Sequence, residues 1–223
     1  MKRTLLAIFI LFCFATISQA QGRFTFRLEA APLFNINLPN ASWKSVSLEA
    51  AKADKVLLGY RIAPSIDFQL SKSVFINSGL NFSLKGNIYS TEDGVKVSNR
   101  VHYLQLPINA GLRFPISSQI GLGLQAGPYF SVALAGAAEK LDLDGIKNSY
   151  EIFKKGVSEL NLQEVSRYDL GVSAQFILYY SDLYGTIGAD FGLWDNFKVN
   201  LSKDTPQQIM RNTAFFIGVG VAL

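Results

Sequence analysis

The chain has very few of the residues on which metal, redox and nucleophilic sites most often depend. Its 223 residues include one cysteine, Cys13, and one histidine, His102. Cys13 lies in an N-terminal segment that we expect to be removed, so the mature chain has no thiol for a disulfide or a metal. The sequence also lacks a phosphate-binding loop, a dinucleotide fingerprint and a four-ligand metal motif. We therefore predict that the protein binds no cofactor.

A long apolar run is missing after the N-terminus, so no transmembrane helix is predicted. The chain opens with Lys2 and Arg3, continues with an apolar stretch from Leu5 to Ala15, and has small residues near position 20. This order is typical of a cleaved secretory signal. A membrane anchor is the alternative, for which the stretch is short. We predict a signal peptide at residues 1–20 and one domain at 21–223, which can cross a membrane only with strands.

The sequence has no strong surplus of either charge. It contains 21 basic and 17 acidic residues, and loss of Lys2 and Arg3 leaves 19 basic residues against 17, a mature net charge of +2. This balance gives no reason to expect a nucleic-acid partner. Linkers and low-complexity tracts are also missing, and about 200 mature residues fit one all-β domain.

The mature chain does contain a strict two-residue alternation of apolar and polar side chains. From Phe24 to Leu38 every second residue is apolar, and the residues between are mostly polar, with Arg27 and Glu29 near the middle. A period of two indicates a strand with two different faces. Oily side chains on one face and charges on the other suit a barrel that sits in lipid. The eight strands predicted in this way span residues 23–38, 56–70, 73–89, 100–114, 118–135, 164–180, 183–196 and 209–223.

The connections between these strands alternate between long and short. Residues 39–55, 90–99, 136–163 and 196–208 form long connections, whereas residues 71–72, 115–117 and 181–182 form tight ones. Outer-membrane barrels show this asymmetry, with long loops outside the cell and short turns in the periplasm. We predict a closed, eight-stranded, antiparallel, up-and-down transmembrane β-barrel with extracellular long loops and both termini in the periplasm.

The third long connection carries a pattern of its own. Ile146, Tyr150, Phe153, Val157 and Leu160 recur at helical spacing. This spacing predicts a short amphipathic helix. We expect the segment to fold back onto the barrel rim, and a partner-binding element is the alternative.

The face opposite the oily one is rich in charge and is predicted to form a polar network inside the barrel. Charges removed from water need partners and hydrogen bonds, and side chains largely fill the interior of an eight-stranded barrel. We predict a plugged lumen in which the arginines meet the acids, with a permeation path as the alternative. Lys85 shares this face, and so do several glycines that leave room for the arginines. The predicted network residues are Arg27, Glu29, Arg61, Asp67, Arg113, Arg167, Asp169 and Asp190.

Some apolar residues fall on the inward face, and some aromatic residues lie near the ends of predicted strands. Phe75, Val101, Ile177 and Phe216 fall on the inward face by parity, so we expect them near barrel ends or at a register shift. Aromatic residues near strand ends fit interfacial girdles, although scattered core aromatics are the alternative. The girdle candidates are Tyr60, Phe68, Tyr89, Tyr103, Phe114, Tyr168, Tyr180 and Tyr184.

Motifs for catalysis are weak. A barrel-borne lipid deacylase would use a histidine beside a serine nucleophile and an acidic residue. Ser98 is near His102 in the sequence, but no acid is clearly placed. Asp142 and Asp144 faintly suggest a calcium loop that lacks its remaining ligands. We therefore predict that the protein is not an enzyme.

The segment Tyr103-Leu104-Gln105-Leu106-Pro107-Ile108 resembles the stretch Y-L-x-[IL]-P-[IL] of the PorT-like outer-membrane β-barrel proteins, often labelled a porin family. Asn109 to Phe114 follows as a glycine-containing strand, and Gly127-Pro128-Tyr129 is similar to the family's G-P-Y. The resemblance in overall architecture extends over the whole mature chain. The sequence motifs of the family match only in two of the predicted strands. The resemblance implies a small OmpA/OmpX-like barrel of a Gram-negative envelope. Some relatives are accessory parts of a protein-secretion machine.

These patterns predict an outer-membrane protein with a structural or interaction role in the cell envelope, with secretion as one version of that role. Expected partners are outer-membrane lipid and lipopolysaccharide, the barrel-assembly machinery, and proteins of an envelope or secretion complex. The alternatives are a narrow porin-like channel for small solutes and a soluble periplasmic ligand-binding β-barrel. The soluble barrel would hide its apolar face inside and expose its charges.

Overall fold

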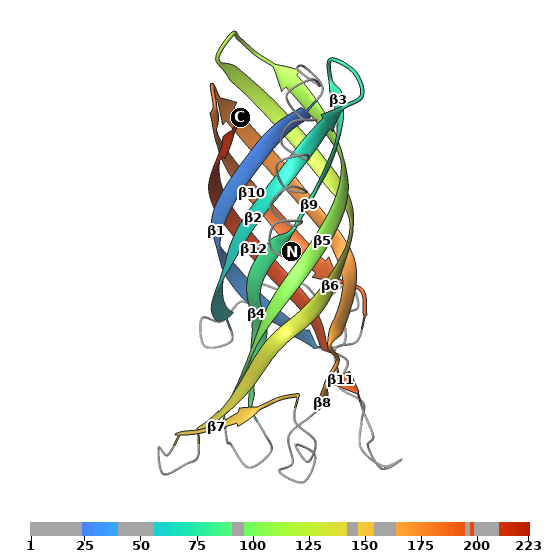
Figure 1. Ribbon diagram of the computed structural model, residues 1–223. Coiled ribbons are helices and arrows are strands. Elements are labelled where there is room, and N and C mark those ends of the chain that lie inside the picture. Colours follow the sequence, from blue (N-terminus) through green and yellow to red (C-terminus); the bar gives the residue numbers. More distant parts are fainter. Residues whose placement is uncertain are drawn as a thin grey trace, which may run out of the picture.

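The computed structural model describes residues 24–39, 56–90, 96–141, 147–153, 164–194, 197–198 and 210–223, which are almost entirely β-strand (Figure 1). Within these ranges no helix is long and apolar enough to cross a membrane. The strands are β1 (Phe24–Pro39), β2 (Val56–Gln69), β3 (Val74–Gly79), β4 (Asn81–Ser90), β5 (Lys96–Pro115), β6 (Ile120–Leu141), β7 (Lys147–Glu151), β8 (Glu164–Val165), β9 (Tyr168–Tyr180), β10 (Leu183–Gly192), β11 (Phe197–Lys198) and β12 (Met210–Ala222).

Antiparallel strands occupy eight positions around a ring, and each position is hydrogen-bonded to both of its neighbours. The order around the ring is β1, β2, β3 with β4, β5, β6, β9, β10 and β12, and β12 pairs again with β1. β3 and β4 share one position because only Leu80 separates them, and both pair with β2 and β5. The eight-strand antiparallel meander predicted from the alternation is therefore confirmed.

The two ends of the ring differ. The β2–β3 hairpin, the β5–β6 hairpin and the C-terminus lie at one end, and β7 lies at the other (Figure 1). We call the first the turn end and the second the loop end. At the turn end the hydroxyl of Ser71 accepts hydrogen bonds from the backbone of Ser73 and Val74, at 3.3 and 3.1 Å. Ser117 repeats this arrangement in the β5–β6 turn with Gln119 and Ile120.

At the loop end the sheet is longer than the sequence predicted. β5 begins at Lys96 rather than near residue 100, and β6 continues to Leu141 rather than ending near residue 135. A register shift opposite His102 and Tyr103 leaves Leu134 and Ala135 of β6 both exposed. β6 then pairs on its other side with β7. The result is a sheet that projects from the ring.

The helix predicted for the third connection is wrong in the part that the structure describes. Tyr150 lies in β7, and the pairing of β7 runs from Lys147 with Leu141 to Glu151 with Ala137. The extended edge of β6 offers backbone hydrogen bonds to this segment, and tertiary pairing of this kind overrides a weak helical spacing. Ile146, Val157 and Leu160 lie outside the described residues.

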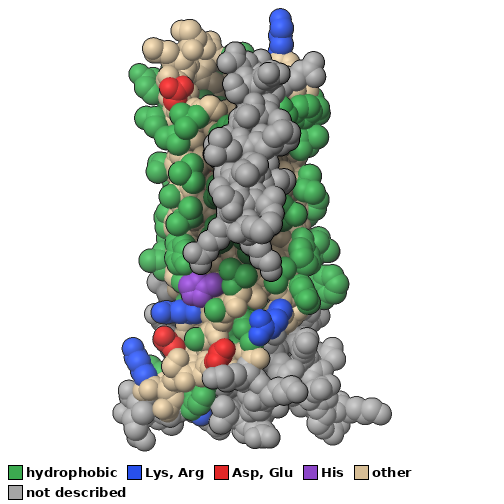
Figure 2. All heavy atoms as spheres, in the orientation of Figure 1, with side chains coloured by type: hydrophobic (Ala, Val, Ile, Leu, Met, Phe, Trp, Pro, Cys, Tyr) green, Lys and Arg blue, Asp and Glu red, His purple; other side chains and the backbone are tan. Residues whose placement is uncertain are grey.

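The ring carries its apolar side chains outside and its polar side chains inside. Exposed and buried residues alternate over the whole length of β9. Hydrophobic side chains lie along both sides of the view in Figure 2, and the charged side chains that it shows gather toward the two ends. Because the apolar face points outward, the alternative of a soluble ligand-binding barrel is wrong: its apolar face would lie inside.

Cysteine substitution at adjacent positions of β9 tests this orientation. Phe176 is 43 % exposed, whereas Ile177 is 0 % exposed. In reconstituted vesicles we expect a bilayer-soluble maleimide to label Phe176→Cys and to spare Ile177→Cys, because successive side chains of a strand point to opposite faces. Both thiols should react after denaturation. Equal labelling of the two folded variants would contradict the assigned faces.

Candidate functional site

The interior of the ring is lined by a network of buried charged and amide side chains. Within the described residues its ionisable members balance, with four basic and four acidic side chains. All are almost completely buried except Arg113, whose side chain is 25 % exposed. The basic members are Arg27 of β1, Arg61 of β2, Lys85 of β4 and Arg113 of β5; the acidic members are Glu29 of β1, Asp67 of β2, Asp169 of β9 and Asp190 of β10.

Asp67 is the centre of the network near the turn end. Its Oδ1 accepts hydrogen bonds from Asn77 at 2.8 Å and from Arg27 Nη1 at 3.3 Å. Its Oδ2 accepts a hydrogen bond from Arg113 Nη2 at 2.9 Å, and the same nitrogen lies 3.1 Å from the hydroxyl of Tyr179. A single carboxylate therefore joins three other strands of the ring, and charge-assisted bonds of this kind are the stronger class.

Glu29 lies between two guanidinium groups in the middle of the ring. Its carboxylate oxygens are 3.9 Å from Arg27 Nη2 and 3.6 Å from Arg61 Nε. Two glutamine amides accept hydrogen bonds from the same two guanidinium groups. Gln125 accepts a hydrogen bond from Arg27 at 3.1 Å, and Gln175, with its amide oxygen turned toward Arg61, accepts from both terminal nitrogens at 2.7 and 3.2 Å.

Lys85 is the cation of the interior nearer the loop end. Its Nζ lies 2.8 Å from Asp190 Oδ2 and 2.7 Å from the amide oxygen of Gln105. The amide nitrogen of Gln105 also donates to Asp190, at 3.3 Å. The ammonium group sits 4.5 Å from the centre of the Tyr129 ring. Both charges are buried, so the pair depends on these additional contacts to offset its desolvation.

Asp169 has no cation of its own. Its Oδ2 accepts hydrogen bonds from the hydroxyl of Tyr129 at 3.3 Å and from Asn212 at 3.1 Å, and both donors are neutral. Within the described residues it forms no ion pair, and its Oδ1 has no hydrogen-bond partner. The carboxylate is nevertheless 0 % exposed.

The guanidinium groups of the network stack on aromatic rings. Each of three arginines lies 4.4 Å from a ring centre: Arg27 over Tyr184, Arg61 over Phe216 and Arg113 over Tyr179. Stacking of this kind is worth about 2 kcal/mol when desolvated. Glycines make room for the rings, because an added Cβ would clash with them. These close approaches are Gly111 to Phe75, Gly171 to Tyr129, Gly188 to Phe216 and Gly220 to Tyr184.

Seven of the eight predicted network residues lie in this interior, and one does not. Arg167 is exposed, and its guanidinium packs 4.4 Å from the ring centre of Phe153. It precedes β9, which begins at Tyr168, so the strand alternation does not apply to it. Lys85 was placed on the inward face but not in the network, although it is the partner of Asp190. Four of the inward glycines, Gly111, Gly171, Gly188 and Gly220, accommodate aromatic rings rather than arginines.

A comparison with models of protein families identifies the family of this chain. Residues 19–198 match the family model described as outer membrane protein beta-barrel domain. The chain belongs to this family. A search of curated proteins found no match. Among solved structures, the Yersinia pestis attachment invasion locus protein Ail, in complex with the heparin analogue sucrose octasulfate, is 9 % identical with a TM-score of 0.45, covering 90 % of this chain and 99 % of that one.

Two further solved structures are similar at the same low level. Neisserial surface protein A is 12 % identical with a TM-score of 0.44, and the match covers 88 % of this chain and 96 % of that one. The N-terminal β-barrel domain of Pseudomonas aeruginosa OprF is 13 % identical with a TM-score of 0.35, and the match covers 91 % of this chain and 100 % of that one.

The aromatic candidates for the interfacial girdles of this outer-membrane protein divide between the outer and the inner face of the ring. Tyr60, Phe114, Tyr168 and Tyr180 are exposed on the outer face. For Tyr103 and Tyr184 the girdle prediction is wrong: they are 2 % and 4 % exposed and point inward, as the parity of β5 and β10 requires. The side chain of Tyr89 lies outside the described residues, whereas Phe68 packs on Phe24 with ring centres 5.1 Å apart.

His102 lies on the outer surface toward the loop end, not in the interior (Figure 2). Its Nδ1 is 3.2 Å from the hydroxyl of Tyr60. Its described side-chain partners include neither a serine nor a carboxylate, which are the groups that nucleophilic catalysis requires. In the described part of the chain no cluster of three or more histidine, cysteine or acidic residues could hold a metal ion.

Proposed function

We propose that this outer-membrane protein is a closed, non-conducting β-barrel that anchors an interaction surface in the cell envelope. In this proposal the loop end faces the outside of the cell and the turn end faces the periplasm. The observation that carries it is the set of hydrogen bonds that cross the interior. They make the ring a filled polar core rather than a pore.

The crossing contacts join strands on opposite sides of the ring. In an eight-position ring each strand has one opposite strand, four positions away. Three of these four pairs are bridged by Arg27 with Gln125, Arg61 with Gln175, and Lys85 with Asp190, at 3.1, 2.7 and 2.8 Å. The fourth pair, β5 with β12, is bridged by the hydroxyl of Tyr103 and Asn212 at 3.4 Å. Every diameter of the ring is therefore crossed by a polar contact.

Planar-bilayer recording tests the filled interior against the narrow channel. We expect the purified full-length protein to give no steady conductance steps, because an ion would have to break these contacts to pass. Heat-shifted gel mobility on the same preparation would show that the protein is folded. Steady, voltage-independent steps from folded protein would instead support the channel alternative.

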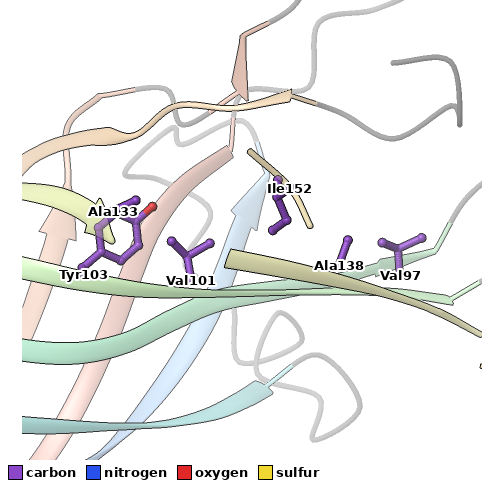
Figure 3. Packing of buried hydrophobic residues seen from close by; sticks show 6 residues of the cluster. All are labelled: Val97, Val101, Tyr103, Ala133, Ala138 and Ile152. Carbon is purple, nitrogen blue, oxygen red and sulfur yellow. The ribbon is translucent and has the colours of Figure 1, made fainter. Parts of the chain in front are cut away.

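The projecting sheet at the loop end is the part of the molecule best suited to an interaction. Its inner face is held by a hydrophobic cluster that joins β5, β6 and the residues after β7 (Figure 3). Tyr150 and Phe153 pack against this cluster. An extension of this kind beyond the lipid is a suitable surface for lipopolysaccharide or envelope proteins. The cluster consists of Val97, Val101, Tyr103, Ala133, Ala138 and Ile152.

A role as an accessory to protein secretion is one version of this proposal. It is supported by the resemblance of Tyr103 to Ile108 to the PorT-like proteins, a segment that here forms the central part of β5. Assembly of the barrel by the envelope's insertion machinery is part of the same proposal. Photo-crosslinking from Ser149 of β7 in intact envelopes, followed by identification of the captured neighbours, tests it. Capture from this position but not from Lys72 at the turn end would support a loop-end partner.

Surface labelling tests the orientation of the protein. Ser149 is exposed on β7, and Lys72 is exposed in the β2–β3 turn at the opposite end. In intact cells we expect a membrane-impermeant maleimide to label Ser149→Cys but not Lys72→Cys, because only the loop end would face outward. Permeabilising the outer membrane should expose the second thiol. The reverse pattern would show that the barrel is inserted the other way round.

A further inference from the structure

The turn end of the ring contains a cavity of about 260 Å³. Five of its lining residues lie by parity on the inward faces of five different strands, β1, β5, β6, β9 and β12. β1 and β6 occupy opposite positions of the ring, so the cavity spans the mouth of the interior and is not a hollow in the outer wall. A ligand for this cavity would therefore come from water rather than from lipid. The five inward residues are Thr25, Arg113, Gly121, Tyr179 and Ala222.

The side chains that line this cavity include a single charge, the guanidinium group of Arg113. No acidic residue is part of the lining: Asp67 is almost completely buried, and Asp182 lies in the β9–β10 turn. Hydroxyl groups and the amide of Gln119 supply the other polar side-chain atoms, and both can donate hydrogen bonds. One cation with several neutral donors favours a negatively charged oxygen ligand. The hydroxyl-bearing lining residues are Thr25, Ser117, Ser118, Tyr179 and Ser181.

Arg113 has donor capacity and charge that its described partners do not use. Both of its described hydrogen bonds come from Nη2, to Asp67 at 2.9 Å and to the Tyr179 hydroxyl at 3.1 Å, and its Nε has no partner. Asp67 also lies 3.3 Å from Arg27, so one carboxylate faces two guanidinium groups. The described ion pairs that include this carboxylate join three arginines to two acids, and Arg113 is the partly exposed member. They connect Arg61, Glu29, Arg27, Asp67 and Arg113 in that order.

Gly121 leaves room inside the cavity. A Cβ added to Gly121 would lie 3.5 Å from the backbone oxygen of Phe114 and 3.8 Å from the Cβ of Tyr179, and both are ordinary contact distances. The wall of the cavity is also tied together, because the backbone N–H of Ser181 donates a 2.7 Å bond to the carbonyl of Gln119. This bond joins the β9–β10 turn to the β5–β6 turn. The cavity is therefore a formed space into which a side chain at position 121 would project.

We propose that this cavity binds one small oxyanion, of the phosphate or carboxylate class, from the solvent at the turn end. Arg113 provides a charge-assisted hydrogen bond from the part of its guanidinium group that Asp67 does not use. The hydroxyls of Ser117 and Ser118 donate to the remaining oxygens of the anion. The site is separate from the interaction surface at the loop end. Only its exposure to the periplasm rests on the proposed orientation, and binding to the purified protein does not.

Thermal unfolding of the full-length protein in a non-ionic detergent tests the site. Sodium phosphate, and in a second series sodium acetate, replaces sodium chloride at constant ionic strength. We expect a saturable rise in the unfolding temperature on the order of 3 °C at a tenfold excess of anion over its Kd, since a ligand that binds only the folded state stabilises it by mass action. The general stabilising effect of phosphate comes from its exclusion from protein surfaces and does not saturate.

Two pairs of variants assign the response to the cavity. Gly121→Leu fills the space and should remove the saturable rise, whereas Gly121→Ala adds one methyl group and should keep it. Ser118→Glu places a carboxylate in the lining from an exposed turn and should also remove the rise. Lys72→Glu makes the matched change at the same end but outside the cavity, and it should keep the rise.

Phosphorus-31 NMR on the wild-type protein provides a measurement that needs no variant to fold. Broadening of the inorganic phosphate signal that an excess of sulfate reverses supports the site. The proposal is overturned if neither phosphate nor acetate gives a saturable rise and the phosphate signal stays sharp. A full saturable response in folded Gly121→Leu and Ser118→Glu would overturn the assignment to this cavity.

Discussion

Replacing Lys85 with methionine is expected to destabilise the folded barrel by about 3–5 kcal/mol, the range found when one partner of a buried ion pair is removed. The change leaves Asp190 buried without the ammonium group that lies 2.8 Å away, and it also removes the donor to Gln105. Urea unfolding in detergent micelles, followed by heat-shifted gel mobility, measures the loss.

The double variant Lys85→Met with Asp190→Leu separates the charge effect from loss of packing. An apolar pair of similar volume is often neutral or stabilising where a buried ion pair was removed. We therefore expect the double variant to recover most of the stability that Lys85→Met loses. Arg100→Met is the matched control, since its ion pair with Glu139 is 3.7 Å long and about half exposed and should contribute about 1 kcal/mol or less. A Lys85→Met variant as stable as this control would contradict the buried pairing.

Reversing the charge of Arg113 is the second change with a large expected effect. Arg113→Glu places a carboxylate beside Asp67, where a guanidinium now donates a 2.9 Å bond, and it removes the stacking on Tyr179. We expect the heat-resistant folded form to be lost, with a destabilisation of at least about 3 kcal/mol. The measurement is the temperature at which the folded gel band disappears.

Two control variants show whether this effect comes from the network. Arg113→Lys keeps the charge but not the planar group that both donates and stacks, so an intermediate loss is expected. Lys72→Glu reverses a charge in the exposed β2–β3 turn and should leave the band unchanged. If Arg113→Glu migrated like Lys72→Glu, the polar-core assignment would be wrong.

The alternation of side chains determined most of the fold in advance. Successive residues of a strand must point to opposite faces, and only one face of each strand in this ring meets lipid. The predicted bounds of β1, β2 and β12 therefore lie within a few residues of those observed. The same parity placed Phe75, Ile177 and Phe216 inside, where the rings of Phe75 and Phe216 lie near the guanidiniums of Arg113 and Arg61.

The alternation of side chains along a strand does not determine which inward residues contact each other. Two residues on opposite strands touch only if the stagger of the strands brings them to the same height, and that stagger is a property of the whole ring. The alternation therefore predicts an arginine as the partner of Asp190, whereas the ring places Lys85 beside it. It also predicts an arginine as the partner of Asp169, and the described residues provide only neutral hydrogen-bond donors.

The amino-acid sequence by itself determined that this chain forms eight antiparallel strands with an oily face and a charged face, because the two-residue period is a local property. Only the tertiary structure decided the length of the β5–β6 extension and the strand character of β7, since both depend on an unpaired edge of β6. It alone also decided that Arg167 lies outside the network and that every diameter of the ring is bridged. These outcomes depend on the stagger and tilt of the hydrogen-bonded strands around the ring. A pattern of neighbouring residues in the sequence does not determine either quantity.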